Sequence, residues 1–594
     1  MADYHPPIRD LRFVMNELND WRAVSALPGF EQASPDLIDD VLNQAGVMAA
    51  KVLAPLNDVG DRQGVRLEAG KVVSPAGFAE AYRQFSENGW QALSHSPDYD
   101  GMGLPYGAQA AATELWNAAN MAFALCPLLT SGAIEAIEAH ASTALKQAYL
   151  PQLISGQWSG TMNLTEPQAG SDLAAICCRA IPDGDRYRLF GQKIYITWGD
   201  HELSENVIHL VLARLPDAPP GVKGISLFLA PKFLLNADGG LGARNDLKAV
   251  SLETKLGIHA SPTCVMSFGD ADGAIAELVG APHQGLACMF TMMNRARLEV
   301  GIQGVAQAER AYQHALAYAK DRRQGGKPGV EGRVAIIEHA DVRRMLLLMR
   351  SLTEAGRAMA GAAAAAYDFA AKTPDDAARD RHMRRLDLLT PVVKGWCTEA
   401  AQEVATLGVQ VHGGMGFIEE TGAAQYLRDA RILPIYEGTN GIQALDLIGR
   451  KLLRDQGEAM GELLADIDNT LAQLSRLEAA ELGGMSDCLQ AAVEALRTAV
   501  DGALAGAEED ADLPNAVAFN LLMLTGYVVG GWQMARAALI ASASQAAGAD
   551  QAFYAAKLKT ARFYAEHVLP RCSGLARTIE FGAVAVMAMG VDEF

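Results

Sequence analysis

Between about residues 160 and 270 the sequence changes from long helical patterns to short strand-like runs, and this change constrains the fold more than any other feature. The runs are rich in β-branched and aromatic residues and are separated by Gly, Pro and Asp turns, which is typical of strands. They cover 187–190, 193–197, 207–212, 225–229 and 263–268. Helical periodicity precedes and follows this block, so we expect an α+β multidomain protein with a central β-barrel-like domain.

The chain has 594 residues, which is too many for a single hydrophobic core. We divide it into an N-terminal helical domain (1–158), a central β domain (159–283), a C-terminal four-helix bundle (284–454) and a helical extension (455–594). The apolar end of the extension, 581–589, is expected to be docked on the protein.

Charge and cysteine usage exclude several classes of function. The net charge is -20 and there is no run of Lys and Arg that could follow a phosphate backbone, so no nucleic-acid partner is expected. The eight cysteines are not spaced like a zinc site or a disulfide framework. We expect them to be reduced and mostly buried, and we expect no metal site.

One uncharged run, 514–535, is long enough to cross a bilayer. Polar residues and glycines interrupt it and no basic segment flanks it, so we expect a buried helix and no transmembrane segment. Peripheral contact with a membrane stays open. The first residues lack an apolar signal core and the composition of a transit peptide, so a cytoplasmic protein is expected.

A single carboxylate, Glu437, lies between an apolar segment (432–436) and the start of a predicted helix at Asn440. Apolar neighbours desolvate a carboxylate and raise its pKa, which suits it to accept a proton near neutral pH. A first-turn acid stabilised by the helix dipole fits the same letters, and this stretch alone favours that ordinary role.

Two further stretches carry side chains suited to a cofactor. The loop 162–173 offers Thr165, Ser171 and backbone N–H groups where a phosphate or a flavin edge could bind. The run 191–197 places Tyr195 and Thr197 on one face of a strand, because they are two residues apart.

These stretches, together with Tyr436-Glu-Gly-Thr439, resemble the acyl-CoA dehydrogenase family over roughly residues 35 to 453. The order of helical domain, β domain and four-helix bundle is also that of the family. The extension after 454 is similar to that of larger bacterial members, including members that act on 3-methylthiopropanoyl-CoA.

The resemblance implies FAD as cofactor and assigns contacts to it residue by residue. Tyr195 takes the place of the usual Trp against the flavin, and Arg322 matches an arginine that reaches the FAD of a neighbouring subunit, which implies a homodimer. The implied FAD contacts are Leu164, Thr165, Ser171, Tyr195, Thr197, Arg322, Gln410, Val411, His412, Gly413, Gly414, Thr439, Asn440 and Gly441. The implied substrate contacts are Ser171, Asn294, Arg297 and Gly438.

The sequence departs from the family pattern at several of these places. Gly325, Ala340 and Gly441 replace residues with longer side chains, and Asn294 replaces a common Asp. His339 and His412 fit plain structural roles as well as cofactor contacts. Ala296 stands where some relatives carry their catalytic base, and since alanine cannot act as a base, Glu437 has no competitor there.

The reaction implied is α,β-dehydrogenation of a saturated acyl-CoA to the trans-2-enoyl-CoA, with Glu437 as the base and hydride transfer to flavin N5. Electrons would pass to an electron-transferring flavoprotein, as in fatty acid β-oxidation. Two alternatives on the same scaffold are an acyl-CoA oxidase that uses oxygen and a 3-methylthiopropanoyl-CoA dehydrogenase. A flavin-bearing binding protein without catalysis is disfavoured by the retained glutamate.

Overall fold

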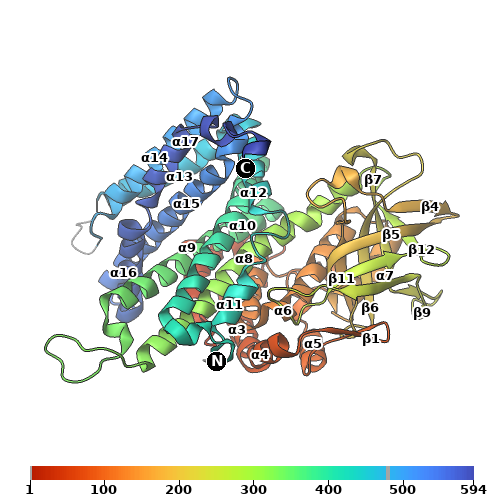
Figure 1. The fold of residues 1–594 in the computed structure, drawn as a ribbon, viewed down its shortest axis with the longest axis horizontal. Helices are drawn as coiled ribbons and strands as arrows, with labels where there is room; N and C mark the ends of the chain where they lie inside the picture. The colour runs from red at the N-terminus through yellow and green to blue at the C-terminus, as the bar shows by residue number, and fades with distance from the viewer. Residues whose placement is uncertain (1–2, 477–481) are drawn as a thin grey trace. The chain divides into compact units, whose positions relative to one another are not determined.

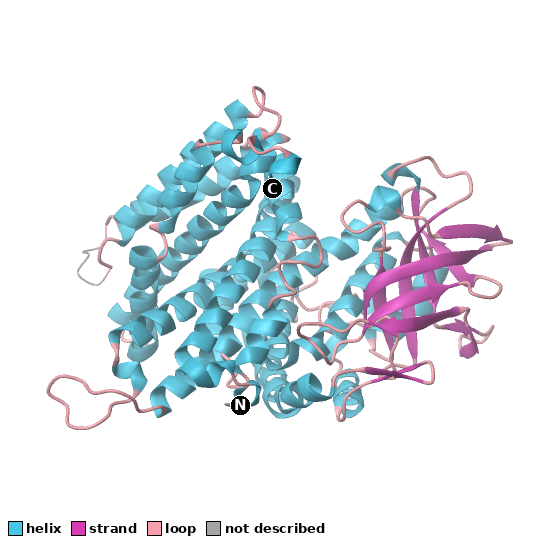
Figure 2. Cartoon of the chain, in the orientation of Figure 1, coloured by secondary structure: helices cyan, strands magenta, loops and turns pink. Residues whose placement is uncertain are grey.

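A computed structural model describes residues 3–476 and 482–594. The chain forms two compact units: unit 1 contains 1–39 and 300–594, and unit 2 contains 40–299. Figure 2 distinguishes helices from strands, and every strand of the described residues belongs to unit 2. The observed arrangement is the α+β multidomain fold expected from the sequence, while the finer division at 158, 283 and 454 stays a prediction.

Unit 2 is built on an eight-stranded sheet with the order β10-β11-β5-β12-β7-β6-β3, and β4 pairs with both β5 and β6. Its strands are β3 (Trp158–Asn163), β4 (Arg179–Asp183), β5 (Arg186–Thr197), β6 (Asn206–Arg214), β7 (Ile225–Pro231), β10 (Leu247–Leu252), β11 (Thr263–Phe268) and β12 (Ala274–Val279). Two small ribbons add β1 (Arg66–Glu68) with β2 (Lys71–Val73) and β8 (Phe233–Leu235) with β9 (Leu241–Arg244). All five predicted runs are strands, and the first two are one strand, β5.

The pairing of β5 with β11 contains a bulge. Cys264 pairs with Ile196 and Met266 pairs with Lys193, so two residues of β5, 194 and 195, lie opposite Val265. A bulge of this kind bends the strand and re-aims a side chain. Here the bulged residue Tyr195 takes a left-handed φ of 59°, which is uncommon for an aromatic residue.

Helices cover one face of the sheet in unit 2. The long α6 (Tyr106–His140) lies against β3, and α7 (Thr143–Ile154) continues from it. Side chains from α6, α7, β3, β6, β7 and the first turns of α8 (Gly285–Asp321) form one buried core. The remaining helices at this end of the chain are α3 (Pro35–Met48), which spans the unit boundary, α4 (Ala54–Gln63) and α5 (Phe78–Glu87).

Unit 1 is a helical assembly in which the bundle and the extension share one core. Figure 1 shows α15 (Leu513–Ala546) running beside the bundle helices α9 (Ala340–Lys372), α10 (Asp376–His412) and α12 (Asn440–Ile448), and it packs against all three. The other helices of this region are α11 (Ala423–Ala430), α13 (Glu458–Leu474), α14 (Met485–Gly506), α16 (Gln551–His567), α17 (Arg571–Glu580) and α18 (Val584–Met587). The first helix, α1 (Ile8–Arg12), continues into η1 (Phe13–Leu18), which packs on α9 and α15.

Within the described part of the chain, two helices, α6 and α15, are long and apolar enough to cross a membrane. The most apolar window of α6 is 94% buried within the protein and that of α15 is 61% buried. Close packing accounts for the glycines of α15: a Cβ on Gly526 would lie 2.3 Å from Cδ1 of Trp396 in α10. The structure therefore buries the uncharged run within unit 1, as the sequence predicts.

The expectation that 581–589 is docked was wrong. Gly582, with a φ of +66°, follows α17, and the short α18 contributes no buried side chain. Phe581 is 65% exposed and Val584 is 79% exposed, because no other described helix covers this end of the chain.

Six of the eight cysteines are buried, Cys177 is exposed, Cys488 is half-buried, and all of them are free thiols.

Candidate functional site

The turn that carries Glu437 lies in unit 1 between α11 and α12. Glu437 has a φ of 59° and Gly438 a φ of 82°, so two consecutive residues are left-handed. Thr439 ends the turn as the N-cap of α12, where its Oγ1 accepts from the Ile442 N–H at 3.2 Å. The helix thus starts one residue after the cap, at Asn440, as predicted, and Glu437 is half-buried.

Hydrogen bonds hold this turn from three directions. The Asn440 N–H donates to the Pro434 carbonyl at 2.9 Å and closes the loop. Gln443 Nε2 donates to the carbonyls of Glu437 at 3.4 Å and Gly438 at 3.3 Å. The Tyr436 hydroxyl donates to Gln303 Oε1 of α8. A left-handed non-glycine residue is strained, and such contacts are what allow it to persist.

In unit 2 the predicted flavin loop is fixed by a buried ion pair that was not singled out from the sequence. Lys193 of β5 is fully buried, and its Nζ donates to Glu166 Oε1 at 2.8 Å and to the Leu164 carbonyl at 2.9 Å. The Glu166 carboxylate also accepts the N–H groups of Cys177 at 2.6 Å and Cys178 at 3.0 Å. The loop between 164 and 178 is therefore closed around one carboxylate.

Burial opposes ionisation of Glu166, but the charge and hydrogen bond of Lys193 outweigh it, so the pKa of Glu166 is lowered. The structure also joins the loop to the strand of the second motif, because the Ile194 N–H donates to the Thr165 carbonyl at 3.0 Å. The signal that could have revealed this pair is the lysine itself, which takes an inward position of β5, as the buried Leu189 and Ile196 do.

The side chains predicted to face the flavin lie on the accessible side of these elements. Tyr195 is 60% exposed, Ser171 is exposed, and Thr165 and Thr197 are half-buried. Leu164 is 9% exposed and belongs to the core. Thr161 Oγ1 donates to the Thr197 carbonyl at 2.7 Å and fixes the end of β5.

The predicted substrate contacts Asn294 and Arg297 lie one turn apart on the part of α8 that belongs to unit 2. Arg297 is 5% exposed, and among the described residues its buried Nε–H has no hydrogen-bond partner. Its neighbour Arg295 is engaged within the protein, with Glu135 at 2.6 Å and Glu299 at 2.7 Å. A buried guanidinium with an unused donor is suited to an anionic or carbonyl ligand.

The remaining predicted FAD contacts lie in unit 1. Arg322 is exposed at the end of α8, and Gly413 and Gly414 form an exposed turn after α10, adjoining the exposed Gln410 and the buried Val411. His412 is 3% exposed, donates from Nδ1 to the Gly408 carbonyl at 2.7 Å, and has a pKa lowered by burial. The Nδ1 contact gives this side chain a structural role, and the FAD contact implied for His412 stays a prediction.

The side chain of Asn440 is 4% exposed and bonded to α10, and Thr439 and Gly441 are exposed. His339 also has a structural contact, because its Nε2 lies 2.8 Å from the Gln324 carbonyl oxygen. The flavin and substrate contacts implied for all these residues stay predictions.

The residues present fit FAD. The hydroxyl-bearing Thr165 and Ser171 lie on a loop that is held rigidly from within, and the exposed ring of Tyr195 lies on the adjoining strand β5. Exposed arginine and glycine N–H groups, the usual ligands of a pyrophosphate, are found at Arg322 and at Gly413 and Gly414.

Comparison with known proteins identifies relatives of this chain. Three family models match: "Acyl-CoA dehydrogenase, N-terminal domain" over 48–157, "Acyl-CoA dehydrogenase, C-terminal domain" over 283–453 and "Acetyl-CoA dehydrogenase C-terminal like" over 463–590. A 3-methylmercaptopropionyl-CoA dehydrogenase from Ruegeria pomeroyi is 50% identical over 574 residues, covering 96% of this chain and 97% of the relative.

A butyryl-CoA dehydrogenase from Syntrophomonas wolfei is 34% identical over 610 residues, covering 100% of this chain and 99% of the relative. Among solved structures, Caenorhabditis elegans ACDH-11 in complex with C11-CoA superimposes with a TM-score of 0.76 at 22% identity, covering 96% of this chain and 93% of that one. This last similarity concerns the fold alone.

Proposed function

This chain belongs to the acyl-CoA dehydrogenase family of FAD-dependent oxidoreductases, and from that premise we propose that it dehydrogenates 3-methylthiopropanoyl-CoA, the same compound as 3-methylmercaptopropionyl-CoA. One observation carries the choice of substrate. The identity of 50% to the enzyme of that name extends over nearly the whole of both chains, whereas the butyryl-CoA relative reaches 34%.

In the proposed reaction the Glu437 carboxylate removes the α-proton beside the thioester, and the β-hydrogen leaves as hydride, which gives the trans-2-enoyl-CoA. FAD, when bound, takes up the hydride. Glu437 is suited to the proton transfer because it is half-buried on a turn that Gln443, Asn440 and Tyr436 hold in place. Negative charge that develops on the thioester oxygen requires N–H donors, and the backbone N–H groups of Glu437 and Gly438 are the candidates.

The contacts to the remainder of the substrate follow from the same assignment. Arg297, with its unused Nε–H, and Asn294 would bind the CoA part, and Ser171 would lie near both substrate and flavin. Thr165, Tyr195 and Thr197 would hold the flavin ring, and Gly413 and Gly414 would hold the adenosine end of an FAD. Arg322 would reach the FAD of a neighbouring subunit.

Three further assignments complete the proposal. An electron-transferring flavoprotein receives the electrons, the protein is a cytoplasmic homodimer, and its pathway is a β-oxidation-like breakdown of the acyl chain. The exposed position of Arg322 supports the homodimer, since the residue is available to a neighbouring subunit.

The substrate is tested by kcat/KM measured with 3-methylthiopropanoyl-, pentanoyl- and butanoyl-CoA and an artificial electron acceptor. Pentanoyl-CoA is the matched control because it carries CH₂ in place of sulfur. We expect the thioether to give the highest value. A higher kcat/KM with butanoyl-CoA would refute the assignment in favour of a short linear substrate, and hydrogen peroxide formed at the turnover rate without an acceptor would identify an oxidase.

A further inference from the structure

A buried lysine lies behind the turn that carries Glu437. Lys394 of α10 is fully buried, and its Nζ donates to Asn440 Oδ1 at 2.9 Å. The amide nitrogen of Asn440 in turn donates to Glu399 Oε1 at 2.8 Å and to Thr398 Oγ1 at 3.0 Å. Burying an ammonium group is costly, so its presence at this position calls for a physical reason.

The contact from Lys394 reaches Glu437 through the backbone of the turn. Asn440 is the first residue of α12, and its N–H closes the loop by donating to the Pro434 carbonyl at 2.9 Å. Between these two anchored ends lie the left-handed Glu437 and Gly438. Because a left-handed glutamate relaxes unless its surroundings hold it, the position of the carboxylate depends on where Asn440 is fixed.

We propose that Lys394 is a positioning residue for Glu437: by anchoring the side chain of Asn440 to α10, it sets the place of the carboxylate on the turn. This proposal rests on the proposed function, in which Glu437 accepts the α-proton. Lys394 acts through Asn440 and the turn, so its loss would affect the proton transfer more than the binding of either ligand. A misplacement of about 1 Å in a reacting group can cost about 100-fold in rate.

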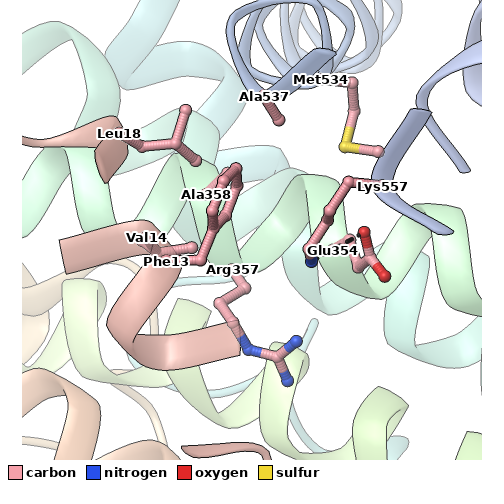
Figure 3. Close-up of a pocket in the computed structure, with 9 residues that line it drawn as sticks. All are labelled: Phe13, Val14, Leu18, Glu354, Arg357, Ala358, Met534, Ala537 and Lys557. Atoms are coloured by element: carbon pink, nitrogen blue, oxygen red, sulfur yellow. Dashed lines mark ion pairs between the residues drawn. The ribbon is translucent and has the colours of Figure 1, made fainter. Parts of the chain in front are cut away.

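A second buried lysine in the same unit provides a matched control. Lys557 of α16 is 4% exposed and forms an ion pair with Glu354 of α9 at 3.0 Å and another with Asp10 of α1. Figure 3 shows Lys557 beside Glu354 at a small cavity that Phe13 also lines. No hydrogen bond or ion pair described for Lys557 involves residues 434–443, so its removal tests loss of a buried charge by itself.

The experiment compares Lys394→Met, Asn440→Ala, the double variant and Lys557→Met as purified FAD-loaded proteins. Methionine has nearly the volume of lysine and leaves no charge behind. We expect Lys394→Met to lower kcat by about 10- to 100-fold, with KM and FAD content within about threefold of wild type. Asn440→Ala should lower kcat into the same range, and the double variant should be no slower than the slower single variant. Lys557→Met should lower the thermal midpoint while kcat per bound FAD stays within about twofold.

Three results would overturn the proposal: a kcat of Lys394→Met within twofold of wild type, an equal loss of kcat in Lys557→Met, or effects of Lys394→Met and Asn440→Ala that multiply in the double variant. If Lys394→Met does not fold, Asn440→Ala alone tests the proposal. An unchanged kcat in Asn440→Ala would show that the anchoring of Asn440 to α10 does not position Glu437. Each ratio is measured with 3-methylthiopropanoyl-CoA and with butanoyl-CoA. A wild type that prefers butanoyl-CoA would count against the proposed substrate. The ratios of variant to wild-type kcat would still test the role of Lys394.

Discussion

Glu166 is only 3% exposed, and its counter-ion is Lys193. Replacing Lys193 with methionine would leave the buried Glu166 carboxylate without that counter-ion. Removing one partner of a buried pair costs about 3–5 kcal/mol, because the remaining charge is uncompensated. A change of 1 kcal/mol shifts the melting temperature of a domain of roughly this size by about 2–4 °C. For the transition of unit 2 we therefore expect a drop of about 6–20 °C at neutral pH.

The drop should depend on pH in a definite direction. In the wild type the pKa of Glu166 is lowered from 4.5, so its stabilising contribution is present above that pH and is lost as the pH falls through the native pKa. In Lys193→Met only burial and hydrogen bonds to neutral groups remain, burial raises the pKa, and acidification neutralises the unpaired charge. The difference between wild type and variant should therefore be largest at about pH 7.5 and clearly smaller at about pH 5.

Differential scanning calorimetry at both pH values measures this effect. Arg188→Met on the same strand is the matched control, because Arg188 and Asp183 form a partly exposed pair at 2.7 Å whose loss should cost under about 1 kcal/mol. Lys193→Met combined with Glu166→Gln should recover part of the lost stability, since no buried charge remains. A drop below 2 °C at pH 7.5, or an equal drop at both pH values, would refute the reasoning.

Other predictions concern packing and the flavin face. Gly526→Ala should lower the free energy of unfolding by about 1–3 kcal/mol, because the added Cβ would lie 2.3 Å from Trp396 Cδ1. Gly461→Ala, on the open face of α13, should raise the free energy of unfolding by about 0.5–1 kcal/mol. Thermal unfolding of both variants measures these effects, and a stabilised Gly526→Ala would contradict the packing. Tyr195→Ala should leave stability within about 0.5 kcal/mol, because the ring is 60% exposed. It should also weaken FAD binding by about 0.5–1.5 kcal/mol, or about 2- to 10-fold in Kd by fluorescence titration, and an unchanged Kd would remove Tyr195 from the flavin site.

Much of the fold follows from local patterns in the sequence. β11 occupies the predicted 263–268, and the predicted start of a helix at Asn440 is the start of α12. Edge and mixed-polarity strands such as β4 and β10 were missed because their exposed residues break the alternation of polar and apolar side chains. The end of the chain was misassigned for the opposite reason: the apolar composition of 581–589 predicts burial, but burial requires a covering element, and composition does not supply one.

Some residues of the candidate site could be predicted from the sequence, whereas the residues that hold them in place could not. Glu437, Tyr195 and the loop around Thr165 are visible as motifs because their chemistry depends on residues close together in the sequence. The groups that hold them are distant in the sequence: Gln303 bonds Tyr436 across 133 residues, and Lys394 bonds Asn440 across 46. The left-handed φ of Glu437 could not be predicted from the identity of that residue, because the sequence signal of such a turn is the glycine that follows it.

The most direct test of the central claim is the anaerobic reaction of Glu437→Gln with excess 3-methylthiopropanoyl-CoA, followed by the loss of flavin absorbance near 450 nm in a stopped-flow instrument. Glutamine keeps the shape of the side chain but cannot accept the α-proton. The account predicts a variant that retains its FAD, still perturbs the flavin spectrum on binding the thioester, and reduces its flavin more than about 1,000-fold more slowly than wild type. Reduction of the Glu437→Gln flavin at close to the wild-type rate would show that another group removes the proton.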